Sequence, residues 1–149
     1  MAHTKQIYMS YWKQLKAFID DRGLDWTFPS FDGVNETVVK IGTPKYKVCL
    51  TLIGADARHP KNMIAAGFWI PDSKETYDLL KAHRMPIEAD MGKRLEWDSL
   101  PGRKSCWVRV SVVMDLSNIK NWPVSFEWFA QNAEKLRDTC VKHGTETDI

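Results

Sequence analysis

The sequence predicts an α+β domain with a mostly antiparallel sheet of about five strands and three main helices. Three observations support this fold class. The expected elements follow the order α-β-β-β-α-β-β-α, and blocks of adjacent strands between helices favour antiparallel pairing. The length of 149 residues is typical of one domain. A hydrophobic content of 44% and a charged content of 27% are ordinary for a globular protein. We therefore expect a single domain over residues 1–149, with an ordered core at about 5–143.

The first helix is expected at about residues 4–22, where apolar residues recur at three- and four-residue spacing. These residues are Ile7, Tyr8, Tyr11, Trp12, Leu15, Phe18 and Ile19. Gly23 is a natural end for this helix. A turn-rich segment then leads to three strands, expected at 36–41, within 46–55, and at 63–70. The last is apolar on both faces, which indicates a central strand covered at least in part on both sides.

The second helix opens after a proline, where Asp72 and Glu75 have the form of a capping box. Pro86 interrupts its pattern and predicts a kink or a new helix start, with an end near Gly92. The third main helix is expected at about 124–143, after a Trp-Pro dipeptide of the kind suited to a first helical turn.

Between these helices, residues 95–113 read as a hairpin with a Pro-Gly turn. In its second strand one face is apolar and carries Cys106, Val108, Val110 and Val112. The opposite face carries Trp107, Arg109 and Ser111. Two interpretations of this face stay open. Trp107 packs beneath a helix while Arg109 reaches past it to solvent, or the two form a surface that binds a ligand or a partner.

The bulk charge and the termini exclude several classes of protein. The formal net charge of +2 comes from mixed basic and acidic residues, too mild by itself to imply nucleic-acid binding. The sequence contains no run of about 18 apolar residues, so no membrane span is predicted, and the first 15 residues lack the pattern of a signal peptide. The three cysteines, Cys49, Cys106 and Cys140, are widely spaced and odd in number. We therefore expect reduced thiols and a cytoplasmic location.

The sequence shows no clear catalytic centre. The four histidines lie far apart, none at ligand spacing from another histidine or cysteine, and no phosphate loop, dinucleotide motif or nucleophile signature occurs. Glu96 and Asp98 share a strand face and could hold Mg²⁺, although a solvated edge is the plainer interpretation. The Glu-x-Lys element of restriction-type nucleases is missing. We expect no metal, no cofactor and no catalytic residue.

Aromatic and basic residues are the remaining candidates for function. The chain has seven tryptophans. Basic residues cluster in expected loops and turns, among them Arg103 and Lys104 in the hairpin turn beside Trp107 and Arg109. Gathered on one side, they could neutralise phosphates, whereas scattered they would form an ordinary solvated surface.

The stretch "LEWDSLPGRKSCWVRV" resembles an uncharacterised bacterial and archaeal family, one of the numbered families of domains of unknown function. Tyr11-Trp12 with Phe18, and Trp122-Pro123 followed by Trp128 and Phe129, agree with it. The resemblance spans about residues 7–141. It implies association with DNA-processing or defence systems, because many relatives carry the domain after a restriction-endonuclease-like module. No such module precedes it in this sequence, so a stand-alone copy is expected.

These observations predict a non-catalytic accessory or binding domain associated with nucleic-acid processing or defence. Its expected binding residues are Trp107, Arg109, Arg103 and Lys104. The alternative is a protein-interaction module, such as a homodimer, that does not bind nucleic acid. A small enzyme is the less favoured possibility.

Overall fold

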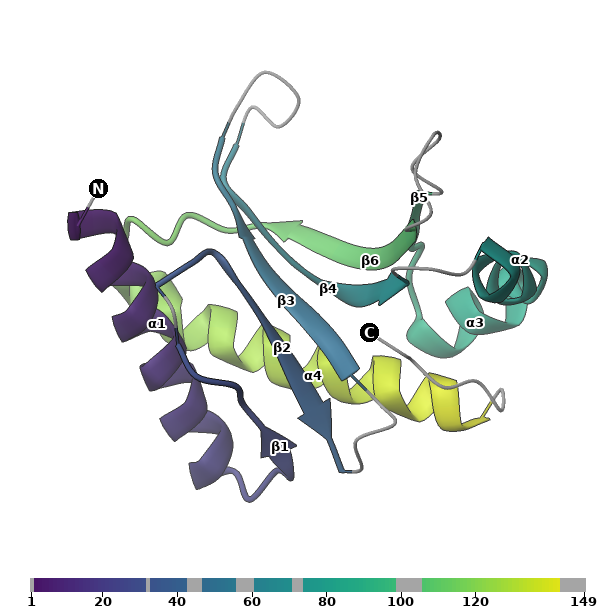
Figure 1. Ribbon diagram of the computed structural model, residues 1–149, viewed down its shortest axis with the longest axis horizontal. Helices are drawn as coiled ribbons and strands as arrows, with labels where there is room; N and C mark the ends of the chain where they lie inside the picture. Colours follow the sequence, from purple (N-terminus) through teal and green to yellow (C-terminus); the bar gives the residue numbers. More distant parts are fainter. Residues whose placement is uncertain are drawn as a thin grey trace.

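The computed structural model describes residues 2–31, 33–42, 47–55, 61–70, 74–98 and 106–142 (Figure 1). Its helices and strands follow one another in the order α1 (Ala2–Asp21), β1 (Trp26–Thr27), β2 (Glu36–Ile41), β3 (Lys47–Ile53), β4 (Met63–Ile70), α2 (Lys74–Ala82), α3 (Arg84–Met91), β5 (Glu96–Asp98), β6 (Cys106–Val113), a 3₁₀ turn η1 (Ile119–Asn121) and α4 (Trp122–Lys142).

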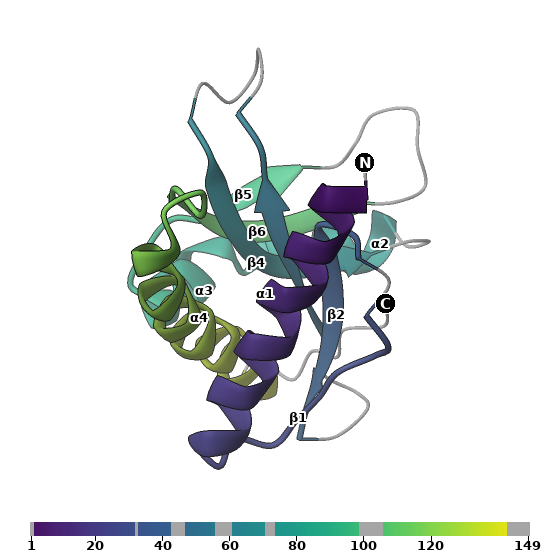
Figure 2. The same ribbon diagram turned by 90° about the vertical axis from the view of Figure 1, so that its left-hand side faces the viewer.

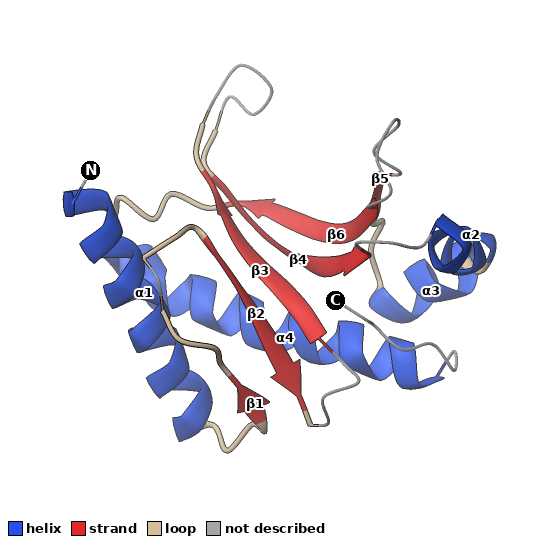
Figure 3. Ribbon diagram, viewed as in Figure 1, coloured by secondary structure: helices blue, strands red, loops and turns tan. Residues whose placement is uncertain are grey.

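In this part of the chain, six strands form one antiparallel sheet in the order β1-β2-β3-β4-β6-β5. Figure 3 shows the sheet as a single layer, with α4 running behind it. Turned by 90°, the molecule shows α3 and α4 together on one side of the sheet and α1 in front (Figure 2). The predicted α+β class and antiparallel sheet are confirmed.

The core fills the space between the helices and one face of the sheet. Alternate residues of the strands enter it, as Val48, Leu50 and Leu52 of β3 do. Val108 and Val110 of β6 are buried there and Val112 packs against them, which confirms the predicted apolar face for these three positions. The helices supply the larger side chains, including Trp12, Leu15, Phe129 and Leu136.

The sheet has six strands among the described residues, and not about five. The additional strand, β1, contains two residues, Trp26 and Thr27, which pair with Ile41 and Lys40. Two residues are too short to show an alternating pattern. This strand forms only because the end of α1 brings the chain back beside β2.

The described residues form four α-helices where three main ones were expected. The expected second helix divides at His83, so that Pro86 falls in the first turn of α3, where a missing N–H removes no helical hydrogen bond. Gly92 ends α3 in the left-handed conformation, with φ 71°, and donates its N–H to the carbonyl of Glu88. Asp72, half of the expected capping box, lies outside the described residues.

A buried hydrogen bond joins α1 to α4 across the layer of helices. Tyr11, 1% exposed, places its hydroxyl 2.7 Å from Ser125 Oγ, and Ser125 donates its only hydroxyl proton to the carbonyl of Trp122. Tyr11 is therefore the donor of the pair. Burial raises the pKa of the Tyr11 hydroxyl, which keeps its proton in place. The Tyr11 ring meets those of Trp12, Trp122 and Phe126 within an aromatic cluster.

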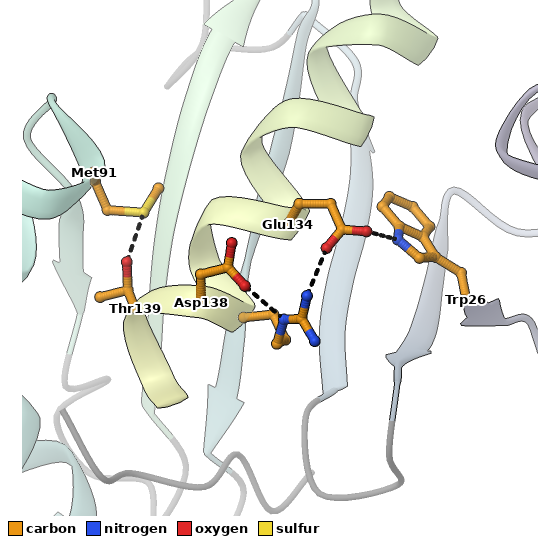
Figure 4. Close-up of polar contacts among 6 residues, drawn as sticks. Trp26, Met91, Glu134, Asp138 and Thr139 are labelled. Atoms are coloured by element: carbon orange, nitrogen blue, oxygen red, sulfur yellow. Dashed lines mark hydrogen bonds and ion pairs between the residues drawn. The ribbon is translucent and has the colours of Figure 1, made fainter. Parts of the chain in front are cut away.

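A second set of polar contacts fixes the short strand β1 to α4 (Figure 4). Trp26 Nε1 donates to Glu134 Oε1 at 3.0 Å, and Arg137 donates to the other oxygen of the same carboxylate at 3.2 Å. Arg137 Nε also lies 2.9 Å from Asp138 Oδ1 as an ion pair. Two residues of strand would not persist alone, so this anchor explains why β1 stays in the sheet.

We expect Tyr11→Phe to lower the free energy of unfolding by about 1 kcal/mol, because Ser125 loses a buried donor while the ring still fits. Urea denaturation measures the change. Tyr8→Phe is the matched control, since Tyr8 is a half-buried tyrosine of the same helix with no described hydrogen bond through its hydroxyl. Equal losses in the two variants would contradict the role of the Tyr11 hydroxyl.

Candidate functional site

The face of the sheet that points away from the core is the candidate site, and we call it the open face. The buried side chains of α1, α3 and α4 belong to the core on the other side. The register of the strands assigns the following described side chains to the open face: Thr27, Glu36, Val38, Lys40, Lys47, Cys49, Thr51, Ile53, Met63, Ala65, Gly67, Glu96, Arg109, Ser111 and Val113. Most of them are partly or fully exposed.

Arg109 is held at the centre of a polar network on β5 and β6. Its Nε donates to Glu96 Oε2 at 3.1 Å, and Ser111 donates its hydroxyl to Glu96 Oε1 at 2.6 Å. Arg109 and Glu96 are directly opposite each other across the two strands. The Arg109 side chain is only 18% exposed, whereas that of Glu96 is 45% exposed. The ion pair therefore fixes the guanidinium beside Glu96 on the open face, with most of the arginine side chain shielded from solvent.

A shallow hollow of about 140 Å³ lies beside Arg109 on the open face, with Glu36, Cys49, Thr51 and Gly67 in its lining. Cys49 is a free thiol, and its sulfur lies 3.7 Å from the hydroxyl of Thr51. Burial raises the pKa of the Cys49 thiol, so the neutral form predominates near pH 7. The hollow is thus polar at its rim and holds no activated thiolate.

Gly67 on β4 allows Arg109 to lie close to the sheet. The two residues are opposite each other in the register of β4 and β6. A Cβ atom added at Gly67 would lie 2.5 Å from the Cβ of Arg109 and would also collide with the carbonyl of Val108. Any side chain at this position therefore has to push β6 away.

The predicted site residues are only partly covered by the structure. Arg109 lies on the open face, as expected from the alternation of β6, but in an ion pair with Glu96. Trp107 is in β6, opposite Trp69 of β4 and Asp98 of β5. Arg103 and Lys104 lie outside the described residues. The grouping of these four residues into one site stays a prediction.

Sequence reasoning missed the residues that surround Arg109. Glu96 was considered as a metal ligand, but it is engaged by Arg109 and Ser111. Thr51 and Glu36 come from strands whose order in the sheet the sequence does not give. A pairing of residues 95–98 with 107–111 was the available signal, because a hairpin places these residues opposite each other.

The described residues contain neither a metal-binding cluster nor a helix that could cross a membrane. No three side chains of the metal-binding types His, Cys, Asp and Glu come together there. None of the helices in the same residues is both long enough and apolar enough to cross a membrane.

A second hollow lies at the end of the sheet, between α1 and the segment that follows β6. Its volume is about 610 Å³, and its lining is mainly apolar, with Tyr8, Leu52, Met63 and Met114 among the lining residues. Ile119, 66% exposed, stands at its rim. Exposed apolar groups around a hollow of this size are typical of a surface that contacts another molecule.

Comparison with known proteins identifies the family. A family model described as Domain of unknown function (DUF4268) matches residues 7–143. The chain belongs to the DUF4268 family. The resemblance to a family of this kind, seen in the tryptophan-rich motifs, is therefore confirmed. No curated protein matches the sequence.

Among solved structures, the DUF4268 chain is similar to the crystal structure of YbjN from E. coli, a proposed transcription regulator. The two are 13% identical, the match covers 91% of this chain and 95% of the other, and the TM-score is 0.45. A likeness at this level carries no argument about function.

We expect Gly67→Ala to destabilise the fold by about 1–3 kcal/mol, because the added methyl group forces β4 and β6 apart beside Arg109. Gly54→Ala is the matched control, since a Cβ there meets no atom within 4 Å. Chemical denaturation of both variants measures the difference. A Gly67→Ala protein as stable as the Gly54→Ala protein would show that the close approach of Arg109 is not required.

Proposed function

We propose that this domain is a non-catalytic binding module in assemblies that process nucleic acid, and that the open face contacts a nucleic-acid strand. The observation that carries the proposal is the fixed guanidinium of Arg109 on the sheet face opposite the core, which none of the described helices covers. An oriented arginine on a flat sheet can approach a phosphate without reorganising. The association with DNA processing implied by the family's relatives supports the choice of ligand.

The charges of the open face are consistent with a modest, salt-sensitive contact. Its described side chains include three cations, Lys40, Lys47 and Arg109, and two carboxylates, Glu36 and Glu96. The sequence adds Arg103 and Lys104 between β5 and β6, shortly before β6 begins at Cys106. Single strands bind such sheet faces through base stacking on aromatic rings and phosphate contacts to basic residues.

A protein-interaction module is the second candidate. The apolar hollow beside α1 favours it, because Ile7 and Ile119 at its rim are 41% and 66% exposed. Contact with another protein would remove this apolar surface from water and its unfavourable free energy of hydration. Light scattering of the purified domain over a range of concentrations tests the homodimeric form of this candidate.

We expect Arg109→Gln to weaken binding of a fluorescein-labelled single-stranded oligonucleotide at least fivefold in 50 mM salt. In a plot of the logarithm of the binding constant against the logarithm of the salt concentration, the slope should become less negative by about one, because one phosphate contact is lost. Fluorescence anisotropy at several salt concentrations measures both values.

Arg22→Gln is the matched control for this experiment. Arg22 is also an arginine paired with a glutamate, Glu127, but it lies at the end of α1, away from the open face. Its substitution should leave the affinity unchanged. An equal loss in both variants, or no binding by the unaltered protein at low salt, would refute the proposed contact.

The non-catalytic part of the proposal has its own test. We expect no cleavage of single- or double-stranded DNA in the presence of Mg²⁺ or Mn²⁺, because Glu96 is held by Arg109 and Ser111. Gel electrophoresis of plasmid and oligonucleotide substrates detects cleavage. Metal-dependent cleavage that is lost in Glu96→Gln would overturn this expectation.

A further inference from the structure

The hollow beside Arg109 exists because β4 carries small side chains at the centre of the open face. Ala65 and Gly67 belong to this face, and both are buried by their neighbours. The residues opposite them on β3 are Thr51 and Cys49, and Arg109 of β6 is opposite Gly67. Larger side chains on both sides therefore flank a floor made by an alanine and a glycine.

The size of the hollow limits what it can hold. Its volume is about 140 Å³. Pockets for drug-sized molecules are larger, roughly 300–1,000 Å³. One small flat group therefore suits this space, and a floor without long side chains lets a ring lie against the sheet.

The hollow has a positive side and a negative side. Arg109 borders it on β6, and Glu36 borders it on β2, opposite Thr51. Both charges act on the Cys49 thiol in the lining. Burial is the main cause of the raised pKa of this thiol; among the smaller effects, the hydrogen bond with Thr51 lowers the pKa, Glu36 raises it and Arg109 lowers it. A group placed in the hollow therefore lies between two opposite charges.

The two charged groups differ in their partners. Arg109 donates to Glu96. Glu36, in contrast, has no hydrogen bond or ion pair with any other residue that the structure describes. Its side chain is exposed, and its carboxylate oxygens are acceptors for a donor that enters the hollow.

An unpaired carboxylate is unfavourable on a face that contacts phosphates, because like charges repel. It is favourable toward a base that carries an amino group. A carboxylate accepts from N4 of cytosine, whereas thymine has an acceptor, O4, at the same position. Thymine beside Glu36 therefore brings two acceptors together and leaves both without a donor.

We infer that the hollow receives one base of a single DNA strand and that Glu36 selects cytosine over thymine. The assignment of the hollow rests on the proposed contact of Arg109 with a phosphate of the same strand. A single strand is required because its unstacked bases expose the edges that side chains read. Thr51 does not discriminate between the two bases, since a hydroxyl both donates and accepts.

Two fluorescein-labelled DNA strands of equal length, one of cytidylate and one of thymidylate, test the inference. They carry the same number of phosphates, so the contact with Arg109 is common to both. Fluorescence anisotropy should give at least about fivefold tighter binding of the cytosine strand, because a hydrogen bond to a carboxylate replaces a pair of facing acceptors.

The Glu36→Gln variant should lose this preference. An amide both donates and accepts, so the variant should bind the two strands with affinities within about twofold of each other. Asp21→Asn is the matched control, because it removes the same charge from an exposed residue at the end of α1, on the core side of the sheet. Its preference for the cytosine strand should equal that of the unaltered protein.

Titration of ¹⁵N-labelled protein by NMR locates the bound base. The cytosine strand should shift the amide signals of residues 36, 49–51 and 65–67, which surround the hollow. The thymine strand should shift the same signals less.

Failure of the inference and failure of the proposed function give different results. Binding of neither strand would refute both. Equal binding of the two strands, a preference that persists in Glu36→Gln, or shifts that spare residues 65–67 would overturn the assignment of the hollow and leave the phosphate contact of Arg109 in place.

Discussion

The burial of one face of the sheet beneath the described helices is the constraint on which the rest of the structure depends. Apolar side chains of β2, β3 and β6 alternate with more polar ones, whereas β4 is apolar on both faces, and the buried set meets α1 and α4. The aromatic cluster around Tyr11 and the contact between Trp26 and Glu134 hold those two helices to each other and to the sheet. Once the helices are committed to this side, the alternating polar residues are left on the open face.

The open face is organised although it lies outside the core. Gly67 lets β6 approach β4, and Arg109 lies over this position with Glu96 as its partner. A partly exposed ion pair of this kind contributes little to stability, about 0–1 kcal/mol. Its effect is geometrical, because it fixes the direction of the guanidinium. The same arrangement on a helix surface, Arg22 with Glu127, has no neighbouring sheet to act with it.

The two ends of the sheet differ in how their last strands are paired. At one end, β5 pairs with the part of β6 around Arg109. At the other, Pro29 ends β1 after two residues, and Trp12 draws the following segment to α1. Among the described residues, the outer edge of β2 from Glu36 to Val39 has no partner strand, and two local features account for this: Pro29 lacks an N–H group, and the indole of Trp12 binds the carbonyl of Val34. Both residues, Pro29 and Trp12, lie outside the strands of the sheet.

The sequence by itself determined the fold class, the strands at 36–41 and 63–70, the apolar face of β6 and a new helix start near Pro86. These depend on local periodicity and on proline, whose effects act over a few residues. Tertiary structure decided the formation of β1, the division of the expected second helix at His83, and the neighbours of Arg109. β1 and the neighbours of Arg109 depend on contacts between residues that are distant in the chain. The division at His83 depends on where the second helix ends and the next begins, and local sequence patterns do not specify that position. The order β1-β2-β3-β4-β6-β5 is what brings Glu36, Cys49 and Arg109 to one hollow, because strand order follows from packing against the helices.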